Sequence, residues 1–99
     1  MDVYFSRKGQ RFVWDSAKAS ANLAKHGVSF EIACEVFFDP LLYLTDASAE
    51  DEARFAAIGE TENWRLLFVV HVERERDTIR IISARNATDK ERIEYEADE

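Results

Sequence analysis

The sequence predicts an α+β fold, in which helices cover one face of a mostly antiparallel sheet of four to five strands. Two runs rich in Val, Ile and Phe, at 65–74 and 78–85, are separated by a short polar turn and indicate a β-hairpin. Helical patterns lie before this hairpin, and a helix-start signal lies after it. The chain has 99 residues, enough for one core of two packed layers, so we expect a single domain over 1–99.

Two N-terminal helices are predicted, at 16–26 and at 30–38. Asp15 and Ser29 precede them and are suited to N-capping, because their side-chain oxygens accept hydrogen bonds from the free amides of a first helical turn. Gly27 ends the first helix, since glycine adopts the left-handed conformation without strain. Apolar residues recur at helical spacing in the second helix, which predicts a buried stripe.

The remaining strands are predicted at 11–14, 41–44 and 54–59. The composition of 54–59 fits a strand or a helix, and the hairpin that follows favours a strand. The first ten residues show no clear periodicity. Thr88 begins a T-x-x-E capping box, which opens one C-terminal helix through about residue 96. An acidic tail follows at about 96–99.

The net charge is −7, from 20 acidic and 13 basic residues, which argues against a nonspecific nucleic-acid coat protein. The acidity is confined to 46–62 and 89–99, whose net charges are −5 and −4. The other 71 residues sum to +2, so the arginine-rich hairpin remains able to meet an anion. The acidic stretches are interpreted either as solvated surface or as contacts for a basic partner.

The sequence also excludes several kinds of site. Its one cysteine, Cys34, permits neither an intrachain disulfide nor a cysteine-based zinc site, and its place on a helical stripe favours a core thiol. No glycine pattern typical of nucleotide binding is present. No apolar run approaches the roughly 20 residues of a membrane helix, and the first residues lack a secretory h-region. We therefore expect a cytoplasmic protein that uses no cofactor and no metal.

The pleat of the strand at 65–74 predicts which face of the sheet is functional. One apolar set is expected to face the helices: Leu66, Phe68, Val70 and Val72. The opposite set includes Arg65, His71 and Glu73, and it is expected to face solvent or a ligand. A hairpin loop of two or four residues would place Arg80 opposite His71, with Glu73 diagonal to both.

A histidine, a carboxylate and a guanidinium on one open face suit phosphodiester chemistry. His71 exchanges a proton near neutral pH, and Arg80 holds a phosphate and stabilises its developing charge. Glu73 either orients His71 or serves as the base. Arg65 lies roughly 20 Å along the strand, at the far end of a groove. The alternative interpretation of this cluster is a surface salt-bridge ladder.

Four further residues have two interpretations each. Arg85 is expected on the helix side, where it caps the C-terminal helix or reaches into a site. His26 is a helix-end cation or a catalyst. Trp14 and Trp64 anchor the core and a loop, or stack on bases.

Blocks of sequence along the whole chain resemble the BrnT toxin family. The opening blocks are FVWD at 12–15, Lys18, NLAKHGVSF at 22–30, Ala33 and EVF at 35–37. The middle blocks are E-x-R at 52–54, IG at 58–59, RLL at 65–67 and ER at 73–74. The closing blocks are RIISAR-x-AT at 80–88, ER at 91–92 and Tyr95.

The resemblance implies a RelE-like fold and the toxin half of a type II toxin–antitoxin system. It implies an endoribonuclease, a hydrolase that cleaves RNA, inhibits translation and arrests growth. The implied partner is a ribbon-helix-helix antitoxin of the BrnA type, whose complex with the toxin binds operator DNA. In RelE-like folds RNA lies against the concave sheet face. The expected catalytic residues are then Arg80, His71, Glu73 and Arg65. RNA or phosphate contacts are expected from Arg85, Lys18, Lys25, His26 and Arg54.

The predicted mechanism is metal-free attack of an RNA 2′-hydroxyl on the adjacent phosphate. Glu73 or His71 takes the proton, and Arg80, with Arg65 or Arg85, neutralises the phosphorane. A function of another class is a non-catalytic toxin-like module that binds an antitoxin and tunes repression. A metal-dependent nuclease is the third alternative, although no carboxylate cluster suggests a two-metal site.

Overall fold

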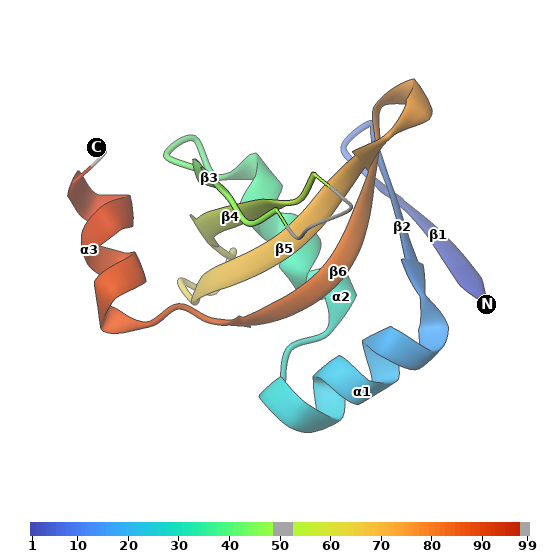
Figure 1. Cartoon of the computed structure of the whole chain (residues 1–99), viewed down its shortest axis with the longest axis horizontal. Coiled ribbons are helices and arrows are strands. Elements are labelled where there is room, and N and C mark those ends of the chain that lie inside the picture. Colours follow the sequence, from blue (N-terminus) through green and yellow to red (C-terminus); the bar gives the residue numbers. More distant parts are fainter. Residues whose placement is uncertain (49–52, 98–99) are drawn as a thin grey trace.

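The computed structural model describes residues 1–48 and 53–97 (Figure 1). Its strands are β1 Asp2–Arg7, β2 Gln10–Asp15, β3 Tyr43–Asp46, β4 Phe55–Glu60, β5 Leu66–Arg74 and β6 Thr78–Asn86. Its α-helices are α1 Ser16–His26, α2 Phe30–Ala33 and α3 Asp89–Ala97, and its 3₁₀ helices are η1 Cys34–Phe38 and η2 Glu75–Asp77. Parts of the acidic stretches, at 49–52 and 98–99, lie outside the described residues.

The strands form one mixed sheet in the order β1-β2-β6-β5-β4-β3. Neighbouring strands are antiparallel except β2 and β6, which are parallel. The α+β class is confirmed. The expected details are wrong: the described sheet has six strands and is mixed, and the helices follow a β-hairpin instead of opening the chain. A RelE-like, mostly antiparallel sheet of four to five strands does not fit this arrangement.

The missed element is β1, which pairs with β2 through a tight turn at Lys8 and Gly9. Both turn residues have positive φ, as a two-residue hairpin turn requires. Val3 and Phe5 of β1 pack against the core, while Asp2, Tyr4 and Ser6 are exposed. The strand was not predicted because Val3, Tyr4 and Phe5 follow one another, so apolar and polar residues do not alternate.

The helix signals are confirmed at the predicted caps. Asp15 accepts a hydrogen bond from the backbone amide of Lys18 at 3.0 Å, and Gly27 adopts the left-handed conformation at φ +69°. Ser29 Oγ accepts from the amide of Ile32 at 3.1 Å. The helix predicted at 30–38 is one turn of α-helix, α2, that tightens into the 3₁₀ helix η1.

The main core lies between the sheet and the layer formed by α1, α2 and η1. Its largest fully buried side chains include Trp14, Phe12, Phe30, Leu67 and Ile81. Cys34 belongs to this core, and burial raises the pKa of its thiol, so the predicted core role is confirmed.

The helix α3 packs on the opposite face of the sheet, over β4 and β5, and stands apart from α1 and α2 in Figure 1. The capping box is present: the amide of Glu91 donates to Thr88 Oγ1, and the amide of Thr88 donates to the Glu91 carboxylate. Tyr95 is buried against Ile58 and Leu66. Both faces of β5 are therefore covered over part of their length.

The β5–β6 turn decides which residues share a face. It spans three residues, Glu75–Asp77, so Arg74 pairs with Thr78. Arg76 and Asp77 adopt positive φ there. The expected loop of two or four residues is therefore wrong. Compared with a loop of two or four residues, a loop of three shifts the pairing by one residue. Each side chain of β6 then lies on the opposite face relative to the side chains of β5.

The predicted side is therefore wrong for β5 and right for β6, where Ile79 and Ile81 pack toward the helix layer as expected. His71 pairs with Ile81 and faces the helix layer, whereas Arg80 pairs with Val72 on the other face. A β-bulge at Ile82 shifts the register once more beyond this point. The residues of β5 that face α1, α2 and η1 are Leu67, Val69 and His71, and those that face away are Phe68, Val70 and Val72.

Candidate nucleic-acid interface

The candidate site is the sheet face opposite α1 and α2, over β1, β2, β6 and the end of β5, which we call the open face. The register sets its side chains in two neighbouring cross-strand rows. One row contains Tyr4, Val13, Arg80 and Val72. The next contains Ser6, Arg11, Thr78 and Arg74. Paired residues point to the same side of a sheet, so these side chains form one surface.

Three arginines therefore share the open face: Arg11, Arg74 and Arg80. Neighbouring rows lie roughly 7 Å apart along the strands, from the rise of two residues. Tyr4 is 77% exposed beside them. A cavity of about 290 Å³ opens at this end of the sheet, and Tyr4, Arg11, Arg76 and Thr78 contribute to its lining. Guanidinium groups beside an exposed aromatic ring suit a ligand that has both phosphates and bases.

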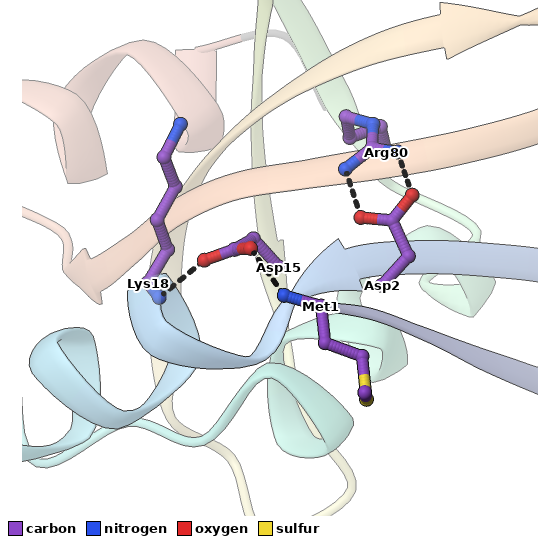
Figure 2. Close-up of polar contacts among 5 residues, drawn as sticks. All are labelled: Met1, Asp2, Asp15, Lys18 and Arg80. Atoms are coloured by element: carbon purple, nitrogen blue, oxygen red, sulfur yellow. Dashed lines mark hydrogen bonds and ion pairs between the residues drawn. The ribbon is translucent and has the colours of Figure 1, made fainter.

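Arg80 lies at the centre of this face and forms a two-pronged ion pair with Asp2. Its Nη1 and Nη2 donate to the two carboxylate oxygens at 3.2 and 2.8 Å (Figure 2). The pair reaches across β2, whose Val13 is the cross-strand partner of Arg80 and is 3% exposed. The hydrogen bond from Arg80 lowers the pKa of Asp2, and the same bond raises the pKa of Arg80. The guanidinium is thus fixed in a geometry that suits a phosphate equally well.

A second carboxylate, Asp15, lies beside this pair. It is the cross-strand partner of Asp2 and caps α1 through the amide of Lys18 (Figure 2). Its Oδ1 also accepts from the Met1 amino group at 3.1 Å. The hydrogen bond from the Lys18 amide is the largest cause that lowers the pKa of Asp15. Asp2 and Asp15 are consequently ionised near neutral pH.

His71 does not belong to the open face. It is 2% exposed and stands edge-on to the ring of Phe37, with 4.8 Å between ring centroids, and near Phe55 at 5.9 Å. Burial lowers the pKa of His71, so the imidazole is neutral in the core at neutral pH. The predicted placement of His71 beside Arg80 on a solvent-facing surface is wrong.

Glu73 and Arg65 are also separated from Arg80. Alternation along β5 puts Glu73 on the side of His71, where it is exposed at the end of the strand. Arg65 precedes β5 at the other end and donates to Asn86 Oδ1 at 3.2 Å. The predicted cluster of His71, Glu73 and Arg80 is therefore not formed, and neither is the alternative ladder between them.

Arg85 shares its side of β6 with Phe68 of β5, away from α1 and α2, so its predicted helix-side position is wrong. Its guanidinium forms two hydrogen bonds with Glu91 of α3, at 2.8 and 2.9 Å, and lies 4.2 Å over the Phe68 ring. Hydrogen bonding between the two groups raises the pKa of Arg85 and lowers that of Glu91. The interpretation that Arg85 caps the C-terminal helix region is supported.

The other predicted RNA contacts are dispersed. Lys18 lies in the first turn of α1, close to Asp15 and the open face (Figure 2). Lys25 and His26 lie in the last turn of α1, roughly 10 Å further along the helix axis by the rise per residue. Arg54 is half-buried just before β4, on the far side of β5 from Arg80. Only Lys18 among these four adjoins Arg80 and its neighbours.

The two tryptophans differ in their settings. Trp14 is a core residue, as predicted. Trp64 is 82% exposed in the turn between β4 and β5, so the expected loop anchor is wrong. Tyr4, Arg11 and Arg74 on the open face were not predicted as functional residues. The Lys8-Gly9 pair was the available signal, because a hairpin there aligns β1 with the strand that carries Arg11.

Within residues 1–48 and 53–97, no three His, Cys, Asp or Glu side chains gather closely enough to hold a metal ion. None of the helices in the described part of the chain has the length and apolar character of a membrane span.

These features define a small α+β protein with an arginine-bearing sheet face suited to anions. The sequence profile described as "Ribonuclease toxin, BrnT, of type II toxin-antitoxin system" matches residues 14–91. The chain belongs to this family, which confirms the resemblance and implies an antitoxin partner.

The crystal structure of the Brucella abortus ribonuclease toxin BrnT is similar to this chain, with a TM-score of 0.53 and 25% sequence identity. The similarity covers 77% of this chain and 94% of the Brucella chain. No curated protein sequence matches this chain.

Proposed function

We propose that this BrnT family toxin is an endoribonuclease that binds RNA on the open face and arrests growth by cleaving it. The observation that carries the proposal is the position of Arg80. It lies in the middle of three arginines, and a carboxylate, Asp2, holds it with the two-oxygen geometry of a phosphate. RNA displaces Asp2 and places a phosphate on Arg80.

Binding to the open face combines charge and stacking. Arg11, Arg74 and Arg80 contact successive phosphates, and Lys18 extends the positive surface. Tyr4 offers an exposed ring on which a base stacks. The net charge of −7 does not oppose this, because the acidic excess resides in 46–62 and 89–99.

The proposed chemistry is metal-independent transesterification. The 2′-hydroxyl oxygen attacks the adjacent phosphorus, the bond from phosphorus to the 5′-oxygen breaks, and a 2′,3′-cyclic phosphate forms. Arg80 stabilises the added negative charge of the phosphorane. Water accepts the 2′-hydroxyl proton and the leaving 5′-oxygen takes a proton from water, because both oxygens of the nearby Asp15 carboxylate already accept hydrogen bonds from Met1 and Lys18. His71 has no part in the reaction because it is buried on the other side.

We also propose that the antitoxin is of the ribbon-helix-helix type and supplies the operator-DNA contacts of the complex. The family supports an antitoxin partner, and the arginine-bearing open face of the toxin is already assigned to RNA. The second candidate function is a non-catalytic module that binds the antitoxin. The observation that favours it is that the described residues of the open face include no histidine.

The test is RNA cleavage by the purified protein, with and without a chelator, for the wild type and for Arg80→Ala and Arg80→Lys. We expect cyclic-phosphate ends in the presence of chelator, and a loss of about 10²–10³ in rate for R80A, the magnitude of removing one charge-stabilising donor. R80K should recover only part of it, because lysine lacks the two-pronged geometry. A wild type that binds antitoxin yet neither cleaves RNA nor slows growth would establish the non-catalytic candidate. Cleavage abolished by the chelator would support a metal-dependent nuclease.

A further inference from the structure

A second surface lies away from the open face, in a groove of about 390 Å³ lined by η1, the β4–β5 turn and α3. We call it the acidic groove. Its apolar walls include Phe38, Leu41 and Trp64, and its acidic groups include Glu35, Glu60 and Glu62. None of these residues takes part in the proposed RNA chemistry.

The exposed wall of the groove is built by a specific turn. Trp64 has φ +64° and its amide donates to the Thr61 carbonyl at 3.0 Å. The amide of Thr61 donates to the Arg65 carbonyl at 2.9 Å, which closes the turn. This turn presents an indole that is 82% exposed, and Leu41 across the groove is 48% exposed. Exposed tryptophan beside an apolar hollow is typical of an anchor point for a protein partner.

The charge of the groove is negative and fixed in place. Asp39 lies in the lining of the groove, where burial alone would raise the pKa of its carboxyl group. Hydrogen bonds from the amides of Glu60 and Leu41 and from the Tyr95 hydroxyl outweigh burial, so the pKa of Asp39 is lowered. Glu35 accepts from the amide of Glu62 at 3.0 Å. The carboxylates are thus positioned by the fold before any partner arrives.

The groove already accommodates cations of this chain. Lys8 Nζ lies 5.2 Å from the centre of the Phe38 ring, and Arg7 pairs with Glu62 at the rim. The lining of the groove includes four carboxylates, Asp39 among them, against these two cations, so a negative excess remains. An ammonium over an aromatic ring and beside a carboxylate is a recognition geometry for lysine and arginine side chains.

We infer that the acidic groove is a docking site for a cationic amphipathic segment of the antitoxin. Lysine or arginine side chains of that segment meet the carboxylates of Glu35, Glu60 and Glu62, and an apolar side chain packs against Trp64 and Leu41. The charge of the groove is complementary to such a segment and repels nucleic acid. The inference rests on the proposed function, since the antitoxin is the partner that the family implies.

The test measures binding of the purified antitoxin to the toxin by calorimetry at two salt concentrations. Trp64→Ala should weaken binding roughly 30-fold, the effect of a tryptophan hot spot. Glu35→Gln keeps an acceptor for the Glu62 amide, and should weaken binding and reduce its salt dependence. The matched controls are Ile93→Ala, an exposed apolar residue on α3 outside the groove, and Glu96→Gln. Both controls should bind like the wild type.

The outcomes distinguish failure of the docking inference from failure of the proposed function. If W64A and E35Q bind antitoxin as tightly as the wild type while keeping its thermal unfolding midpoint, the groove is not the docking site, and the proposed function stands. If the wild type itself fails to bind the antitoxin, the inference fails, whereas RNA cleavage by the wild type still supports the proposed endoribonuclease. RNA cleavage by W64A alone should equal that of the wild type, whereas equimolar antitoxin should neutralise it less completely.

Discussion

His71 and Arg80 lie on opposite faces of the sheet, one residue out of step across the β5–β6 hairpin. His71 pairs with Ile81 beneath η1, and Arg80 pairs with Val72 on the open face. The imidazole is packed between Phe37 and Phe55, while the guanidinium is held by Asp2 in a neighbourhood of other arginines. The first residue is therefore structural, and the second is the one positioned to meet an anion.

The burial of His71 predicts a pH dependence of stability. Its folded-state pKa lies below the value of about 6.5 expected for the unfolded chain. The unfolded chain then binds a proton more readily, so this residue's contribution is fully present above about pH 6.5 and declines as the pH falls below it. His71→Phe should flatten the decline between pH 7.5 and 5.5 in urea denaturation, and should leave RNA cleavage unchanged. A variant that loses cleavage but keeps the wild-type pH dependence would restore His71 as a candidate catalyst.

The helices could be predicted from the sequence because their signals are local. A cap such as Asp15 or Ser29 acts within three residues of its position, and both caps form as predicted. The sides of the sheet depend instead on one loop length. β5 has apolar residues on both faces, and the polar residues Arg65, His71 and Glu73 pointed to the wrong face because His71 is buried. The three-residue turn at Glu75–Asp77 pairs Arg80 with Val72, so Arg80 and His71 lie on opposite faces.

Only part of the candidate site could therefore be predicted from the sequence. Arg80 was singled out, since it stands in a block that resembles the family. Its surroundings were not, because Tyr4 and Asp2 come from β1, which was not predicted, and reach Arg80 across β2. The pairing of β2 with β6 joins residues 65 or more positions apart in the chain, and no short-range pattern reports it.

Removal of the ion pair between Asp2 and Arg80 should increase the affinity of the protein for RNA. Asp2→Asn keeps the shape of the side chain and removes the charge that competes with RNA phosphate. Binding of single-stranded RNA should tighten about two- to fivefold, the modest effect of an exposed ion pair. Fluorescence anisotropy with a labelled oligonucleotide measures this, and Glu96→Gln, which removes a charge on α3, controls for the change in net charge. Weaker binding by D2N would mean that Asp2 positions Arg80 and does not compete with the ligand.

The neighbouring arginines predict a change in salt dependence. Arg11→Ala or Arg74→Ala should each reduce the slope of log affinity against log salt by about 0.7, the contribution of one phosphate contact on a single strand. Arg92→Ala on the exposed surface of α3 is the control, and its slope should equal that of the wild type. If the slopes of all three variants equal that of the wild type, the RNA binds elsewhere on the molecule.

Among the described residues outside the apolar core, Asn22 is the one whose substitution should reduce stability most. It is 8% exposed and joins α1 to β6: its Nδ2 donates to the carbonyls of Val28 and Ala84, and its Oδ1 accepts from the Ala84 amide. Asn22→Ala leaves these backbone groups buried and unpaired, which should cost roughly 2–3 kcal/mol of unfolding free energy. Ser20→Ala, exposed on the same helix, should change it by less than about 0.5 kcal/mol. Asn22→Asp should be as damaging as the alanine variant at pH 7, because a carboxylate cannot donate to the two carbonyls, and should recover partly at low pH when the protonated acid donates to one of them. Urea denaturation of the four proteins measures these differences, and an N22A stability within 0.5 kcal/mol of the wild type would show that water satisfies the freed groups.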